Sequence, residues 1–256
     1  MQTNSSSLKN YILVTGAYWV FTLSDGALRM LVLLHFYTLG YNALQIALLF
    51  LFYELAGIIT NLVGGWIGSR FGLKSTLIVG LCLQVFALSA LAGFDPSWPV
   101  WQAVSFVMAM QALSGVAKDL TKMSSKSLVK LVVADGQQSK LFKWVSLMTG
   151  SKNAVKGFGF LTGALLLSFT SFETSLIIMA LILALMFILL LINLKTNISE
   201  VNKKSKFSEV FSKNKDINYL SLGRVFLFGS RDTWFVVGLP IFLYSALSDG
   251  SLDGNK

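Results

Sequence analysis

The sequence predicts an all-α fold, a polytopic bundle of membrane-spanning helices, and two observations lead to it. Of the 256 residues, 54% are hydrophobic and only 13% are charged, whereas a soluble domain carries roughly a quarter charged residues. The apolar residues also occur in long blocks, and a bilayer core requires about 20 mostly apolar residues for each helical span. Several blocks meet that length, so we expect a membrane protein and not a soluble globular domain.

Hydrophobic blocks separated by short links predict seven spans. The expected helices cover residues 11–38, 43–69, 74–94, 99–127, 140–170, 172–194 and 218–247. Only the link between the sixth and seventh spans is long, polar and rich in lysine. The chain is therefore expected to comprise a six-helix half (1–194), a basic inter-domain loop (195–217) and the first helix of a second half (218–256). This order is typical of half of a six-plus-six transporter, so we expect seven of twelve helices, from a truncated gene model or fragment.

The distribution of basic residues predicts the orientation in the membrane. Arg70 and Lys74 follow the second span, a run of lysines follows the fourth, and six lysines lie in 195–216. The links after the first, third and fifth spans contain no Lys or Arg. Because basic loops stay in the cytoplasm, the N-terminus is expected to be cytoplasmic. The net charge of +9 then follows from topology, so lipid is the expected partner and nucleic acid is not.

Residue types that support catalysis or metal binding are scarce. The sequence contains one cysteine, Cys82, and one histidine, His35, so thiolate or imidazole metal sites have little raw material. No nucleophile–base constellation is recognisable either. We therefore expect neither an enzyme nor a cofactor.

A glycine-rich motif lies between the second and third spans. In "GGWIGSRFGLK" (64–74), the residues Gly65, Ile67, Gly68, Arg70, Gly72 and Lys74 resemble the loop signature Gly-x-Leu-Ala-Asp-Arg-x-Gly-Arg-Lys of the major facilitator superfamily. The motif departs from that signature at Ser69 and Leu73, two positions of the charge relay in other members. Glycines allow a tight turn and close helix approach, and the basic residues can pair with a neighbouring helix end. The resemblance implies a major-facilitator bundle; a glycine turn with basic anchors is the alternative.

A narrower resemblance covers nearly the whole chain. The stretches "VTGAYWVFTLSDGALRMLVLLHFYTLGY", "NLVGGWIGSRFGL", "QALSGVAKDLTKMSSKS", "TGSKNAVKG" and "GSRDTWFVVGLP" look like the organoarsenical-efflux permeases of arsenic-resistance operons, the ArsJ-type family. The resemblance implies export of 1-arseno-3-phosphoglycerate, supplied by a partner glyceraldehyde-3-phosphate dehydrogenase. It also implies a multi-pass protein of a prokaryotic inner membrane.

Polar residues of the first two spans are candidates for proton coupling and gating. One face of the first span carries Thr15, Tyr18, Thr22, Asp25 and Arg29. Asp25 and Arg29 can pair, either as a neutralised buried ion pair or in a gating or coupling role. Glu54, near the middle of the second span, is the first choice for proton coupling, followed by Asp25 and Asp232. A permanently protonated or hydrogen-bonded structural Glu54 is the alternative.

Basic residues inside the spans are candidates for binding an anion, because buried charges usually face a bundle interior or an aqueous cavity. The expected substrate-binding residues are Arg29, Lys118, Lys122, Lys152, Asn153, Lys156 and Arg231. Lys152 and Lys156 repel each other unless an anion or an acid lies between them, and pairing with Glu54 or Asp25 is the alternative. Gln111, Ser114, Lys118, Lys122 and Ser125 share a helical face. Lys118, Lys122, Lys126 and Lys130 recur every four residues, and we expect Lys126 and Lys130 to lie toward the lipid headgroups.

The excess of intramembrane basic residues over acidic ones predicts an anionic substrate. We expect a secondary transporter that exports an organoarsenical by alternating access, with inward proton flux as the driving force. The alternatives are an exporter or exchanger of sugar phosphates or other organic anions, and a non-transporting membrane receptor or scaffold.

Overall fold

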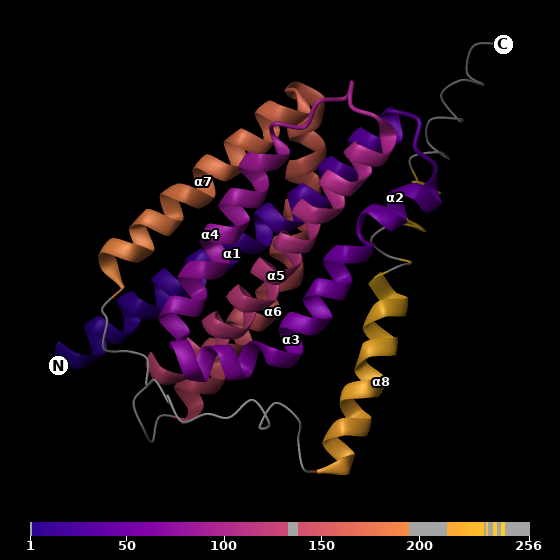
Figure 1. Cartoon of the computed structure of the whole chain (residues 1–256). Coiled ribbons are helices and arrows are strands. Elements are labelled where there is room, and N and C mark those ends of the chain that lie inside the picture. The colour runs from indigo at the N-terminus through magenta and orange to yellow at the C-terminus, as the bar shows by residue number, and fades with distance from the viewer. Residues whose placement is uncertain are drawn as a thin grey trace.

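The computed structural model describes the backbone of residues 2–132, 138–194 and 214–232, and of 234, 238–239 and 242–243 (Figure 1). Side chains are described within these ranges except at 2–7, 130–132, 225, 228–229 and 231–232. The elements are α1 (Gln2–Thr38), α2 (Ala43–Leu49), α3 (Leu51–Phe71), α4 (Leu73–Leu91), α5 (Val100–Val132), α6 (Gln138–Phe169), α7 (Phe172–Asn193) and α8 (Lys215–Asp232). No strand occurs within these ranges, and the prediction of an all-α membrane bundle is confirmed.

Five segments of the described chain are long and apolar enough to cross a membrane. They are Leu8–Thr38, Ala43–Phe71, Leu73–Leu91, Val100–Val129 and Phe172–Asn193. The other two predicted spans correspond to α6 and α8. The 32 residues of α6 are sufficient in length, but Lys152 and Lys156 lie within the helix and lower its apolar content. The 18 residues of α8 are less apolar still.

The largest differences between the predicted and observed helix boundaries occur at three places. The expected helix 43–69 is interrupted at Phe50, which ends α2 and begins α3 with φ −90° and ψ −6°. The interruption involves neither Gly nor Pro, so the residue types do not signal it. The first helix begins at Gln2 instead of residue 11, which extends it through a polar segment. The expected helix 218–247 is observed as α8 over 215–232, and most of its remainder lies outside the described residues.

The helix contacts of α1–α7 follow the pattern of two inverted three-helix repeats. The first repeat comprises α1, α3 and α4, and the second comprises α5, α6 and α7. Their most extensive contacts include α1 with α6 and α3 with α5, which are equivalent pairs when α1, α3 and α4 are matched in order with α5, α6 and α7. Inverted repeats of this kind are found within each six-helix half of major-facilitator transporters. Helix α4 packs on α5 and α7 and closes the bundle.

Glycines allow these equivalent pairs to approach closely. A Cβ at Gly159 of α6 would lie 2.5 Å from the Leu23 carbonyl oxygen of α1. A Cβ at Gly26 of α1 would lie 2.8 Å from the Lys156 carbonyl oxygen of α6. Gly115 of α5 lies in direct contact with the Tyr53 backbone of α3. Small residues of this kind are typical of interfaces between membrane helices.

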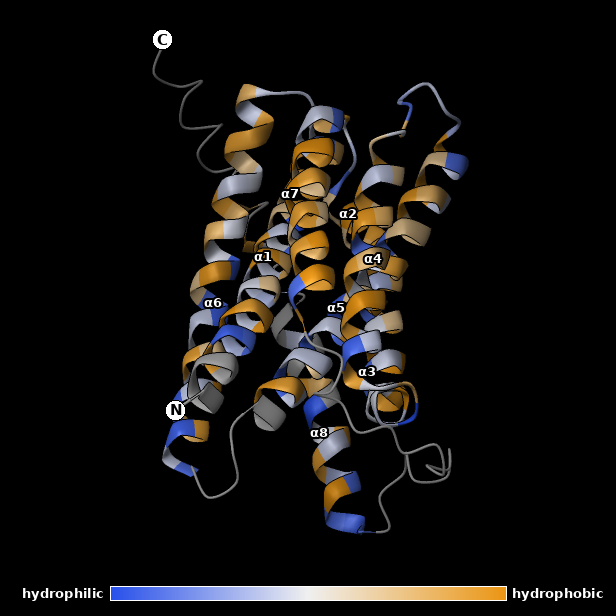
Figure 2. Cartoon of the chain, turned by 90° about the vertical axis from the view of Figure 1, so that its left-hand side faces the viewer, coloured by the Kyte–Doolittle hydropathy of each residue, from blue (hydrophilic) through white to orange (hydrophobic). Residues whose placement is uncertain are grey.

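Large apolar side chains cover the outer faces of the bundle. On α7, Leu181, Leu185 and Ile192 are exposed, and on α6 Phe158 and Phe169 are exposed. Figure 2 shows that α7 is hydrophobic along nearly its whole length. In a soluble protein such faces would have to be covered, whereas a bilayer solvates them. All described side chains of α8 are exposed as well.

Candidate functional site

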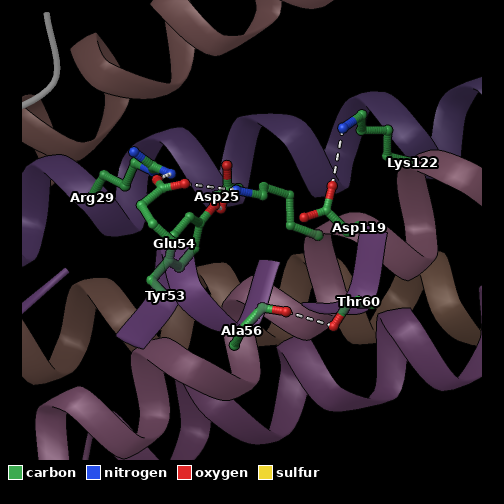
Figure 3. A network of polar contacts seen from close by, with 9 residues as sticks. Asp25, Arg29, Tyr53, Glu54, Ala56, Thr60, Asp119 and Lys122 are labelled. Atoms are coloured by element: carbon green, nitrogen blue, oxygen red, sulfur yellow. Dashed lines mark hydrogen bonds and ion pairs between the residues drawn. The ribbon is translucent and has the colours of Figure 1, made fainter. Parts of the chain in front are cut away.

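Charged side chains from α1, α3 and α5 meet at Glu54. Arg29 Nη2 donates a hydrogen bond of 2.6 Å to Glu54 Oε1, and Lys118 Nζ lies 3.7 Å from Glu54 Oε2. Figure 3 shows Arg29 and Glu54 pointing toward each other. The Arg29 side chain is only 3% exposed, compared with 22% for Lys118 and 38% for Glu54. Glu54 is therefore ion-paired in this conformation, between two cations that come from different helices.

The expected Asp25–Arg29 ion pair is not among the ion pairs of the described residues. Asp25 instead accepts a hydrogen bond from the Tyr53 hydroxyl. The two residues are one helical turn apart, but α3 supplies a closer acceptor to Arg29 and a donor to Asp25. Helical spacing alone could not predict that exchange of partners, because it depends on how α3 packs against α1.

Tyr53 joins the members of this cluster and was not predicted from the sequence. The Arg29 guanidinium carbon lies 4.2 Å from the centroid of its ring, and Lys118 Nζ lies 4.1 Å from the same centroid. Both distances are suitable for cation–π attraction. The Tyr53 side chain is fully buried. The sequence signal for its role is its position next to Glu54, the carboxylate near the middle of the second span.

The three acidic residues in and around the Glu54 cluster are balanced by cations in number. Asp25 and Glu54 balance Arg29 and Lys118 in number, and Asp119 Oδ1 lies 3.0 Å from Lys122 Nζ. Asp119 is buried against Gly57 of α3. Figure 3 shows the Asp119–Lys122 pair beside the Glu54 cluster. Lys126 of α5 and Lys152 and Lys156 of α6 add further positive charge around this cluster.

Lys152 and Lys156 of α6 are both half-buried. Among the described residues, Lys152 has no ion pair or hydrogen bond. Its electrostatic neighbours are Asp25 and three like-charged residues of α5: Lys118, Lys122 and Lys126. Lys156 Nζ lies 5.6 Å from the Phe160 ring centroid, and its charge acts on Glu54. Asn153, between the two lysines, is exposed.

Two predicted site residues, Arg231 and Asp232, have side chains outside the described residues. The side chain of Lys130, predicted to lie toward the lipid headgroups, is also outside them. The inter-domain loop is also outside, except for its last residues.

The glycine-rich motif forms the turn between α3 and α4. Gly72 links the two helices with φ 86°, a conformation that favours glycine. Lys74 Nζ donates a hydrogen bond of 2.5 Å to the Leu194 carbonyl oxygen at the end of α7. The Arg70 guanidinium lies 5.4 Å from the Trp66 ring centroid. A Cβ at Gly68 would lie 2.9 Å from the Leu73 side chain, whereas Gly65 faces open space.

Comparison with known proteins identifies the family. The family model of the Major Facilitator Superfamily matches residues 14–251. The chain belongs to this superfamily. A solved structure of this fold, described as a POT family transporter in complex with a thioalcohol-conjugated peptide, aligns with a TM-score of 0.60 at 15% identity. The alignment covers 93% of the chain and 47% of that structure, so the chain spans about half of its length.

Comparison with curated proteins finds no match. The superfamily membership and the apolar helices make this a multi-pass membrane protein of a transporter family. At 15% identity the solved structure supports the fold alone. The substrate must therefore be inferred from the charges in the bundle.

Proposed function

We propose that this superfamily member is a secondary active transporter that exports an organic anion by alternating access. The observation that carries this proposal is the location of the excess positive charge. Six basic residues in or around the Glu54 cluster accompany three acidic ones, Asp25, Glu54 and Asp119; the basic residues are Arg29, Lys118, Lys122, Lys126, Lys152 and Lys156. Three ammonium groups of α5, those of Lys118, Lys122 and Lys126, act on the ammonium group of Lys152 in α6, and a multiply charged anion that binds among them offsets this repulsion.

Arg29 supplies a donor for such an anion. One of its terminal nitrogens is used by Glu54, but its Nε is buried and has no acceptor among the described residues. A guanidinium donates in a planar fork that matches phosphate and arsenate oxygens. We assign substrate binding to Arg29, Lys118, Lys122, Lys152, Asn153 and Lys156, and to Arg231 by sequence.

The specific substrate we propose is 1-arseno-3-phosphoglycerate, from the resemblance to organoarsenical-efflux permeases. A glyceraldehyde-3-phosphate dehydrogenase would supply it in the cytoplasm. We also propose that the protein lies in a prokaryotic inner membrane with its N-terminus in the cytoplasm. Its second half is proposed to begin at residue 218, after a basic loop. Other organic anions such as sugar phosphates are the second candidate, because the same cations recognise phosphate as well as arsenate.

Proton antiport is the proposed coupling, and it follows from a choice of partner for Arg29. Ionised Glu54 holds Arg29 toward α3, with the Nε donor left for the substrate. Asp25 is one turn away from Arg29 on α1, a spacing at which side chains can pair. When Glu54 is protonated, Arg29 turns to Asp25 and the substrate loses this donor. Proton and anion then occupy the site in turn; Asp232 is a further candidate for proton exchange.

Uptake of labelled 1-arseno-3-phosphoglycerate into inverted membrane vesicles tests the function. We expect the double variant Lys152→Ala, Lys156→Ala to lose most of the uptake. Lys143→Ala is the matched control, because Lys143 is an exposed lysine of the same helix. Equal uptake by the double variant and the wild type would overturn the binding role.

Competition by unmodified 3-phosphoglycerate separates the two substrate candidates. If the site is specific for the arsenical, an excess of 3-phosphoglycerate should leave the uptake of labelled 1-arseno-3-phosphoglycerate unchanged. Complete inhibition would favour the broader organic-anion transporter.

A further inference from the structure

Two glutamines buried between the spans have amide atoms without partners. Gln84 on α4 and Gln111 on α5 are both 0% exposed. Gln84 Oε1 accepts a hydrogen bond of 2.8 Å from Ser114 Oγ. Within the described residues, Gln84 Nε2 and both amide atoms of Gln111 have no hydrogen-bond partner. The Gln84–Ser114 hydrogen bond joins α4 to α5, and three amide atoms of the two glutamines are buried without partners among the described residues.

Amide groups differ in this respect from the buried hydroxyls of the bundle. Some buried hydroxyl groups also lack a partner, such as Thr121 Oγ1. A Ser or Thr hydroxyl can rotate to the carbonyl four residues earlier in its own helix, as Thr22 and Ser124 do. A side-chain amide nitrogen can donate to such a carbonyl, as that of Asn193 does, but the backbone N–H groups inside a helix are already used, so the amide oxygen of Gln111 has no local donor. Its unpaired burial costs free energy that a ligand or another conformation must recover.

The glutamines lie in register with the cations of the proposed site. Gln111, Ser114 and Lys118 follow one face of α5 at spacings of three and four residues. At a rise of 1.5 Å per residue, Ser114 lies about 6 Å and Gln111 about 10 Å along the helix from Lys118. Lys118 belongs to the Glu54 cluster, so the row of Lys118, Ser114 and Gln111 runs from this cluster to the amide atoms that have no partners. A short substituted carbon chain can span that length.

We propose that Gln111, with Gln84 held by Ser114, is the hydrogen-bonding end of the substrate site and takes a hydroxyl or carbonyl group of the transported anion. This inference rests on the proposed anion transport and narrows its substrate class. The anionic group lies at Lys118 and Lys152, and the uncharged polar group lies toward Gln111. A site built to hydrogen-bond a substrate hydroxyl rejects the analogue that lacks it far more strongly than an apolar pocket can.

The experiment compares two anions of equal charge that differ in one hydroxyl. The probes are the proposed substrate, labelled 1-arseno-3-phosphoglycerate, and its labelled 2-deoxy analogue, taken up into inverted vesicles that contain the whole protein. We expect the wild type to prefer the hydroxylated anion by at least about tenfold. The variant Gln111→Met keeps the length of the side chain and removes the amide. It is expected to lower uptake of the hydroxylated anion to the level of the deoxy analogue, whose uptake stays within about twofold.

Two further variants separate recognition from folding. Gln102→Met on the exposed surface of α5 is the control and is expected to change neither uptake. If the amide has no protein partner, Gln111→Met should also raise the thermal midpoint of the purified protein, because it removes an unpaired buried group. Equal loss of both uptakes in Gln111→Met, a lower thermal midpoint, or an unchanged preference would overturn this inference.

Failure of the anion-transport proposal would look different. In that case Lys152→Ala would leave the uptake of both anions unchanged. If only the present inference is wrong, Lys152→Ala would still lower both uptakes.

Discussion

Gly115 of α5 lies in direct contact with the backbone of Tyr53 on α3. Gly26 of α1 makes the equivalent contact with the Lys156 backbone of α6. Each glycine is followed three residues later by a cation, Lys118 in one repeat and Arg29 in the other, and both cations reach Glu54. The two cations are therefore positioned by backbone packing of inverted repeats, and the single carboxylate between them is shared by both.

The close packing of α1 on α6 predicts a sharp difference between two neighbouring glycines. A Cβ at Gly159 would lie 2.5 Å from a backbone carbonyl oxygen, whereas a Cβ at Gly157 would meet no atom within 4 Å. Overpacking of this kind costs about 1–3 kcal/mol, so Gly159→Ala is expected to destabilise the protein. Gly157→Ala should be neutral or stabilising by up to about 1 kcal/mol, from helix propensity. Equilibrium unfolding in mixed micelles measures both; equal stabilities would contradict the packing.

The Tyr53 hydroxyl is expected to matter separately from its ring. Tyr53→Phe keeps the ring below Arg29 and Lys118 but leaves the buried Asp25 carboxyl without its donor. Loss of a hydrogen bond to a buried group costs about 1–3 kcal/mol, and stability should fall by that amount. Tyr53→Leu also removes the cation–π contacts with Arg29 and Lys118, so it should lower anion uptake more than Tyr53→Phe does.

The control for both Tyr53 variants is Tyr219→Phe, because Tyr219 is exposed on α8. Thermal midpoints and vesicle uptake are measured for all three variants. A Tyr53→Phe protein as stable as the control would show that Asp25 finds another donor.

Glu54→Gln is expected to abolish coupling to protons. The amide mimics the protonated acid, so it leaves Arg29 free to pair with Asp25 and lowers anion binding. For the wild type, proton and anion exclude each other, so uptake into inverted vesicles should fall as the pH on the substrate side falls. The variant should lose this pH dependence along with accumulation driven by a pH gradient.

The control for Glu54→Gln is Glu173→Gln, an exposed acid at the start of α7. It should retain the wild-type pH profile. Tighter anion binding in Glu54→Gln than in the wild type would reverse the proposed order, since anion and proton would then bind together.

The spans were predictable because lipid imposes a length and a composition on each helix. The polar face of α1 was equally visible, and Thr15, Asp25 and Arg29 are all buried. The partner of Arg29 was not visible, because it depends on the approach of α3. The role of Tyr53 could not be predicted for the same reason. The interruption at Phe50 could not be predicted either, because no Gly or Pro marks it. Sequence periodicity identifies a face, whereas tertiary packing decides which groups on two faces meet.

Lys74 predicts a local effect on the end of α7. Its ammonium donates to the Leu194 carbonyl oxygen, and the negative end of the α7 dipole also attracts a cation at this place. Lys74→Ala removes this contact, and we expect a loss of about 1 kcal/mol in the local opening free energy of the last turn. Hydrogen exchange at the Leu194 amide, which donates to the Leu190 carbonyl, should therefore be about fivefold faster. The middle of α7 should exchange as in the wild type, and Lys74→Arg should largely restore protection. Unchanged exchange at Leu194 in Lys74→Ala would mean that the contact does not hold the end of the helix.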